Sequence, residues 1–282
     1  MLKQLLKYEF KATSRLYGGL YLALALLSVM LGFTFRQETT PLAVNVNFQR
    51  FEAGLAIVYV SVILAIAVLC FVNTVRRFYQ NLLGREGYLM HTLPVTETQL
   101  IVSKLLTSMV WVLCSMLVGI VCITIMVSIG VFDSETFGMV DWDSWKKLVS
   151  YLFDGLGAKF WMILFWSIVI NLTRLASIIL CVYAACMVAH QFKKHVMVAG
   201  IVAFVAMNMV ENQITRVLGT DDVGLIMDIH VRFLYYSSGE SNASALLTTN
   251  VGYLICFAVT AAIAAAYFFL TRWLMKNKLN LE

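Results

Sequence analysis

The chain has 282 residues, of which 61% are hydrophobic and only 13% are charged, and its formal net charge is +5. An ordinary soluble domain is about half apolar and about a quarter charged. The composition therefore excludes a water-soluble enzyme, a collagen-like chain and a disordered chain. It predicts an all-α, polytopic membrane protein.

Six long runs that are nearly free of Asp, Glu, Lys and Arg predict six transmembrane helices in a single domain, 1–282. A bilayer core of about 30 Å takes about 20 helical residues to cross, and backbone groups in lipid must find hydrogen bonds within their own segment. The expected spans are residues 16–35, 53–75, 100–131, 159–190, 196–216 and 250–272.

The first fifteen residues place leucines on one arc of a helix and basic residues at four-residue intervals on the adjoining arc. This pattern predicts an N-terminal interfacial amphipathic helix whose basic side faces anionic membrane lipid. The basic residues concerned are Lys3, Lys7, Lys11 and Arg15.

Positive charges are distributed unevenly between the two sides of the predicted membrane. If both termini lie in the cytoplasm, the inside segments hold thirteen Lys and Arg residues and the outside segments hold seven. This bias obeys the positive-inside rule and predicts cytoplasmic termini. The net charge then reflects topology and attraction to anionic lipid, and no nucleic-acid partner is expected.

The predicted cytoplasmic segment from Asn73 to Gln99 is too long for a tight turn and too apolar for a solvated loop. Residues 76–83 have the pattern of a short amphipathic helix, and Leu93-Pro94 ends the element because a residue before proline avoids the helical conformation. Thr96, with Gln99 three residues later, predicts a capping box at the start of the third span.

The string Gly87-Tyr88-Leu89-Met90-His91-Thr92-Leu93-Pro94-Val95, followed by Ser103-Lys104-Leu105-Leu106, resembles the cytoplasmic segment of permease subunits in type-2 ABC exporters. The small six-span permeases of Gram-positive bacteria are the nearest pattern, and Leu6-Lys7-Tyr8-Glu9-Phe10-Lys11 is similar to their opening helix. The resemblance implies location in the bacterial plasma membrane, cytoplasmic ABC ATPase subunits as partners, and a second permease subunit as a homodimer or heterodimer partner.

The resemblance further implies that residues 76–94 form a coupling helix, which presses into a groove of the ATPase so that ATP-driven closure moves the spans. A coupling element needs apolar anchors and a charged rim. The alternative is an interfacial helix that lies on lipid. The residues assigned to ATPase coupling are Arg76, Arg77, Phe78, Tyr79, Leu82, Leu83, Arg85, Glu86, Tyr88, Met90, Leu93 and Pro94.

The chain contains no GxxxxGK[ST] phosphate loop, no HExxH and no GxSxG motif. Its four histidines are scattered, and all six cysteines fall within predicted spans without a CxxC pair. We therefore expect no catalytic residue, no metal site and no cofactor in this chain, with ATP and Mg bound by the partner ATPase.

Two ionisable residues are predicted to lie within the bilayer, Arg174 and Glu211. A charge at the bilayer centre costs about 2.5–3.5 kcal/mol on insertion scales and must find a partner or water. Both residues lie about 22–24 Å from the same short cytoplasmic turn, at 1.5 Å per residue, so their depths match. We predict a pair or shared polar network that joins two helices or faces the transport path. Its members are Asn171, Thr173, Arg174, Asn208, Glu211, Asn212 and Gln213.

The function expected from these patterns is that of the permease subunit of an ATP-driven exporter, which moves a peptide, lipid or drug-like substrate. Two alternatives remain open. One is a membrane scaffold or sensor that works without an ATPase, and the other is a proton-coupled secondary transporter that uses Arg174 and Glu211.

Overall fold

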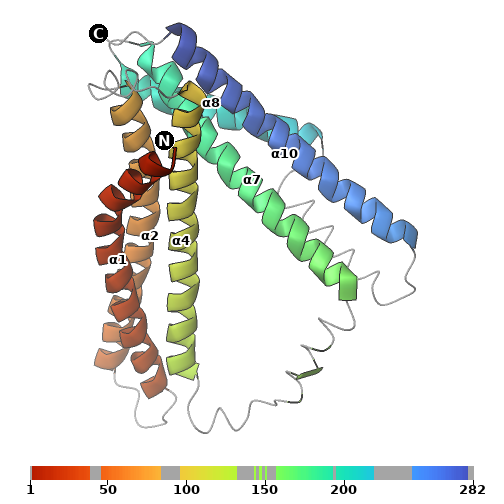
Figure 1. The fold of residues 1–282 in the computed structure, drawn as a ribbon. Helices are drawn as coiled ribbons and strands as arrows, with labels where there is room; N and C mark the ends of the chain where they lie inside the picture. Colours follow the sequence, from red (N-terminus) through yellow and green to blue (C-terminus); the bar gives the residue numbers. More distant parts are fainter. Residues whose placement is uncertain are drawn as a thin grey trace. The chain divides into compact units, whose positions relative to one another are not determined.

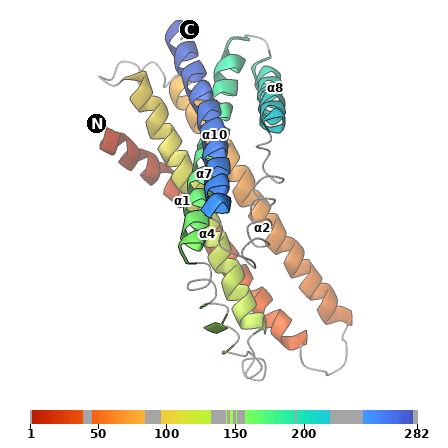
Figure 2. The same cartoon turned by 90° about the vertical axis from the view of Figure 1, so that its right-hand side faces the viewer.

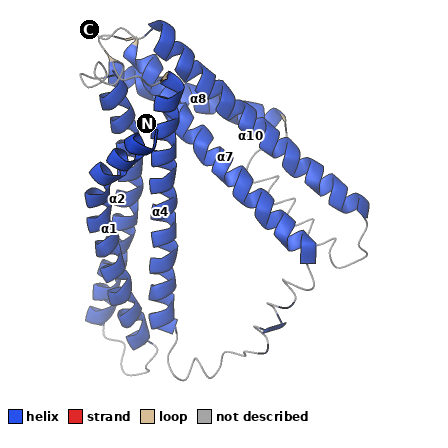
Figure 3. Ribbon diagram, in the orientation of Figure 1, coloured by secondary structure: helices blue, strands red, loops and turns tan. Residues whose placement is uncertain are grey.

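The fold is described from a computed structural model. The structure describes residues 2–38, 46–83, 96–131, 143, 146–147, 150, 157–192, 195–218 and 243–278. These residues form helices and short turns, and none of them belongs to a strand (Figure 3). The all-α class expected from the sequence is therefore confirmed for the described part of the chain.

Six of the described helices are long and apolar enough to cross a membrane (Figure 1). Their number agrees with the six expected spans and indicates a multi-pass membrane protein. The helices are α1 (Leu2–Glu38), α2 (Val46–Phe78), α4 (Glu97–Val131), α7 (Gly157–His190), α8 (Val196–Val217) and α10 (Ala243–Lys278), and a π-helical turn, η1 (Tyr79–Leu83), follows α2 directly.

Two boundaries differ from the sequence-based expectation. The first fifteen residues do not form a separate helix, because α1 continues without a break from Leu2 to Glu38. The expected short helix over residues 76–83 is also not separate, since α2 runs through Phe78 and passes into η1. Single π-helical turns are rare and occur frequently at functional sites.

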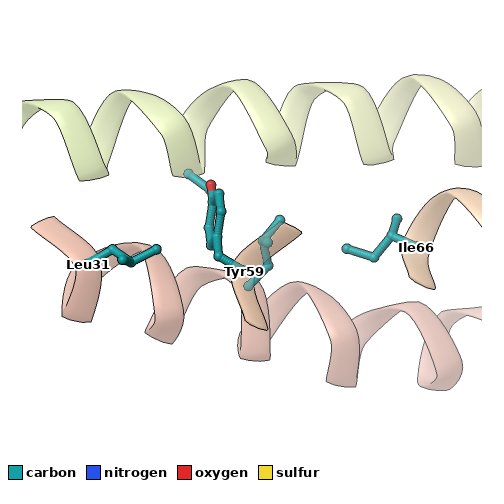
Figure 4. Packing of buried hydrophobic residues seen from close by; sticks show 5 residues of the cluster. Leu31, Tyr59 and Ile66 are labelled. Atoms are coloured by element: carbon teal, nitrogen blue, oxygen red, sulfur yellow. The ribbon is translucent and has the colours of Figure 1, made fainter. Parts of the chain in front are cut away.

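The described chain divides into two compact units, and each is treated by itself. In the first unit, α1, α2 up to Thr74 and α4 from Val102 pack around Leu24, Leu31, Tyr59 and Cys122. Figure 4 shows Tyr59 of α2 reaching toward α4, with Leu31 of α1 nearby. Apolar side chains gain little by leaving lipid, so such a core depends on close van der Waals packing.

The helices α1 and α4 run parallel in this unit. Tyr17 stacks on Trp111 with ring centroids 4.4 Å apart, and Tyr21 shares a hydrogen bond of 2.6 Å with Ser115. Both pairs are separated by 94 positions, which fixes one constant register between the helices. Parallel α1 and α4 are what alternating membrane crossings require of the first and third spans.

The second unit contains residues 75–101 and 146–282, and α7, α8 and α10 are its long helices. In Figures 1 and 2, α7 and α10 lie side by side. Trp166 of α7 donates a hydrogen bond of 3.2 Å to Asn250 Oδ1 of α10, and Ile170, Tyr253 and Cys256 are buried between these helices. The amides of Gln191 and Phe192 bond back to α7 in a turn, and no residue of α8 is buried.

Candidate functional site

The end of α2 and the η1 turn carry the first six residues that were assigned to ATPase coupling. Phe78 and Leu82 are fully buried, and Leu83 is 5% exposed. The ring of Phe78 stacks on the ring of Tyr183 in α7, with centroids 4.1 Å apart and an interplanar angle of 10°. The assignment of these three side chains as anchors for a partner is therefore corrected, because they are buried within the chain itself.

The outward side of the same segment is polar and aromatic. Arg76 is exposed, and its Nε donates a hydrogen bond of 2.9 Å to Gln80 Oε1 one turn later. Tyr79 is partly exposed and contacts His190 edge to face, with ring centroids 6.2 Å apart. Arg77 is partly buried. The segment thus has a buried inner side against α7 and an outer side that includes Arg76.

The start of α4 carries the predicted capping box. The backbone N–H of Thr96 donates to Gln99 Oε1 at 3.3 Å, and the N–H of Gln99 donates to Thr96 Oγ1 at 3.4 Å. This reciprocal pattern satisfies two amide groups that a helix start otherwise leaves unpaired. The prediction is confirmed. The other residues assigned to coupling lie outside the described residues, namely Arg85, Glu86, Tyr88, Met90, Leu93 and Pro94.

Glu211 on α8 is held by a residue that the sequence analysis did not select. The hydroxyl of Tyr267, on α10, donates to Glu211 Oε2 at 3.0 Å, and it also lies 3.3 Å from the backbone oxygen of Met207. The thiol of Cys181 on α7 interacts with the same hydroxyl. Three helices therefore meet at the Tyr267 hydroxyl.

Arg174 and Glu211 interact electrostatically. Both side chains are partly exposed. Asn208, one turn before Glu211, donates from Nδ2 to the backbone oxygen of Phe204 at 2.8 Å and to the Cys181 thiol at 3.7 Å. The structure thus brings together Arg174, Asn208 and Glu211 from the predicted cluster, and adds Tyr267 and Cys181.

The remaining residues of the predicted cluster have different surroundings. Asn171 donates to the backbone oxygen of Ser167 at 2.7 Å, and Thr173 donates to that of Val169 at 2.8 Å, so both bond within α7. Asn212 and Gln213 are exposed on α8. Bonds to the preceding turn satisfy a polar side chain in lipid without a partner helix, so the side chains of Asn171 and Thr173 need no partner on α8.

A second polar and aromatic cluster lies in the first unit and was missed. Tyr17, Tyr21 and Trp111 stack or hydrogen bond around Ser115, whose hydroxyl also lies 3.3 Å from the Cys70 thiol. Single Ser, Cys and Tyr residues in an apolar run are too common in membrane helices to predict such a cluster. The shared four-residue spacing, Tyr17 to Tyr21 on α1 and Trp111 to Ser115 on α4, is the signal that could have found it.

The described residues contain no group of three or more His, Cys, Asp and Glu side chains placed to hold a metal ion. No family model, curated protein or solved structure matches this chain. The arrangement itself can do two things: the η1 segment fixes the end of α2 to α7, and the Tyr267 hydroxyl links α8 to α10 through Glu211.

Proposed function

We propose that this chain is the membrane-spanning permease subunit of an ATP-driven exporter of the type-2 ABC class, in the plasma membrane of a bacterium. Both termini lie in the cytoplasm. A separate ABC ATPase binds and hydrolyses ATP with Mg, and a second permease subunit, identical or related, completes the transporter. The substrate is a peptide, a lipid or a drug-like molecule.

The observation that carries the proposal is the two-sided form of the segment 76–83, which comprises the end of α2 and the η1 turn. A coupling element must be stiffly attached to the helices that it moves, and it must present charge and aromatic surface to its partner. Phe78, Leu82 and Leu83 supply the attachment, since all three are buried and Phe78 stacks on Tyr183 of α7. Arg76 and part of Tyr79 remain on the outside. The sequence of residues 87–95, which resembles the cytoplasmic segment of type-2 ABC permeases, supports the same assignment.

Site-specific crosslinking in native membranes tests this function. A photoactivatable amino acid replaces Arg76, which is exposed at the end of α2, or Tyr88 in the resembling string. The matched control replaces Leu64, which is 60% exposed in the middle of the same helix α2. We expect residues 76 and 88 to capture a protein that carries a phosphate loop, and Leu64 to capture none. Capture of no ATPase from either position contradicts the proposal.

A proton-coupled secondary transporter is the second candidate. The observation that favours it is Glu211, a carboxylate within an apolar helix that is hydrogen bonded by Tyr267 and lies within the electrostatic reach of Arg174. Intramembrane carboxylates serve as proton relays in many transporters. If this candidate is correct, the purified chain in liposomes, without any ATPase, should dissipate an imposed pH gradient. An exporter subunit should not do so.

A scaffold or sensor that works without an ATPase is the remaining alternative. It predicts that the chain is recovered alone or with proteins that lack a phosphate loop, and that nucleotide does not change its conformation. The crosslinking experiment above separates this alternative from an exporter, because only the exporter requires an ATPase at residues 76 and 88.

A further inference from the structure

The C-terminal part of α7 contains a continuous buried stretch. Every residue from Ile179 to Met187 is buried. Because protein interiors are closely packed, the displacement of a side chain that touches this stretch is passed on to the helix. A group that contacts this stretch can therefore shift the whole of α7, including Arg174 at the middle of the helix.

Two adjacent residues of the segment 76–83 contact one face of α7. Phe78 stacks on Tyr183, and Tyr79 meets His190 edge to face. Tyr183 and His190 are seven positions apart, which is two helical turns or about 10 Å along the axis. The segment therefore contacts α7 at two points. The more deeply buried contact is the stacked pair of rings of Phe78 and Tyr183, both fully buried.

The polar cluster lies further along the same helix. Arg174 precedes Tyr183 by nine positions, or about 14 Å along α7. Its electrostatic partner Glu211 belongs to α8 and is hydrogen bonded to Tyr267 of α10. A shift of α7 relative to α8 and α10 changes the distance between Arg174 and Glu211. The hydrogen bond from Tyr267 meanwhile holds the Glu211 side chain in one orientation.

We propose that Tyr183 is a positioning residue of the transport cycle: its ring takes up the displacement of the segment through Phe78, and α7 carries that displacement to Arg174. The inference rests on the proposed function, because the ATPase supplies the displacement. It adds two points to that function: α7 is the element that moves, and the contact between Phe78 and Tyr183 moves it.

A purely structural role for the two stacked rings makes a different prediction. Loss of a packing contact lowers stability, but it leaves the surroundings of a probe near Glu211 unchanged. A double-mutant cycle with a probe near Glu211 distinguishes the two roles, because coupling is the part of the effect that is not additive.

The experiment uses the full-length chain in lipid nanodiscs with a nitroxide at Asn212→Cys, an exposed position next to Glu211. The chain without this new cysteine gives the background from the six native cysteines. Phe78→Leu, Tyr183→Leu and the double variant form the cycle, and Tyr183→Phe keeps the ring. Tyr59→Leu, a buried tyrosine in the other unit, is the matched control. If the leucine variants do not fold, Phe78→Met, Tyr183→Met and their double variant form a second cycle.

We expect Phe78→Leu and Tyr183→Leu to change the nitroxide line shape in the same direction, and the double variant to add nothing further. Tyr183→Phe and Tyr59→Leu should match the parent chain. Additive effects, or an unchanged line shape in both single variants, overturn the proposal.

A second arm separates this inference from the proposed function. In the complex with the captured ATPase, ATP and vanadate should change the line shape in the parent and in Tyr183→Phe. In Tyr183→Leu that change should be lost while ATP hydrolysis persists. A nucleotide response that survives in Tyr183→Leu overturns the role of Tyr183. If no ATPase is captured but the cycle is non-additive, the link between the segment and α8 stands and the proposed function fails.

Discussion

The hydroxyl of Tyr267 on α10 donates a 3.0 Å hydrogen bond to the carboxylate of Glu211 on α8, and the two residues are 56 positions apart in the chain. The bond connects two helices within the second unit at a point where the apolar sequence of α10 offers few other polar groups. Hydrogen bonds to charged groups contribute about 1.5–3 kcal/mol, and bonds between membrane helices are often weaker, at about 0.6 kcal/mol on average.

Replacement of Tyr267 by Phe should lower the stability of the chain by about 1–2 kcal/mol, because Glu211 loses a donor while the ring is kept. Thermal unfolding in detergent, followed by size-exclusion chromatography, measures the loss. Tyr59→Phe is the matched control, since the Tyr59 hydroxyl is buried and has no hydrogen-bond partner in the described part of the chain. Its removal should leave stability unchanged or raise it. Equal losses in the two variants would contradict the role given to Tyr267.

Neutralisation of one member of the Arg174 and Glu211 pair should be more harmful than neutralisation of both. Removing one partner of a buried pair typically costs about 3–5 kcal/mol, and the partial exposure of both side chains places the cost here below that range. Arg174→Gln and Glu211→Gln should therefore each reduce the folded yield, and the double variant should recover much of it.

The yield of folded chain after extraction, measured by fluorescence-detected chromatography, gives the comparison. Asn171→Ala is a suitable control because Asn171 is exposed and bonds within its own helix. If the double variant folds well but its complex with the ATPase no longer transports substrate, the charges of Arg174 and Glu211 are needed in the transport path itself. If it folds no better than the single variants, the two residues do not act as a pair.

The sequence predicted those features that depend on local pattern or on length. Span number follows from uninterrupted apolar length, and the capping box of Thr96 and Gln99 is a property of four adjacent residues. The proximity of Arg174 and Glu211 could be expected because both are counted from one short turn, which fixes their depth.

Features that depend on helix rotation and on distant partners could not be predicted. Tyr267 lies in an apolar run, and nothing in that run shows which neighbour its hydroxyl meets. Phe78, Leu82 and Leu83 were assigned to a partner because an apolar side chain does not reveal what covers it. The structure covers them within the chain itself. Hydrophobic pattern shows that a side chain is buried, and only the tertiary arrangement shows by what.

Replacement of Thr96 by Ala should weaken the first turn of α4 by about 1 kcal/mol, because the amide of Gln99 loses its side-chain acceptor. Hydrogen exchange of the amides near residue 99 should then be faster, with little change beyond the first two turns. Thr98→Ala, within the same turn, is the control. Slower or unchanged exchange near Gln99 in Thr96→Ala would show that the capping box does not stabilise this helix start.

Gly32 marks a close approach between α1 and α4. A Cβ atom at this position would lie 2.7 Å from the Cβ of Ile129 and 3.0 Å from the backbone oxygen of Met126, and a backbone oxygen cannot rotate away as a side chain can. Gly32→Ala should therefore push the two helices apart and lower stability by about 1–3 kcal/mol, the usual cost of overpacking. Small residues at such contacts let membrane helices approach closely.

The control for Gly32→Ala is Gly119→Ala on α4, where nothing lies within 4 Å of the added Cβ. Alanine favours a helix over glycine by about 1 kcal/mol in water, so this variant should be neutral or more stable. Thermal unfolding of both variants in the same detergent separates overpacking from helix propensity. Should Gly32→Ala be as stable as Gly119→Ala, the two helices do not pack at Gly32 as closely as described, and the constant register between α1 and α4 does not extend to their C-terminal ends.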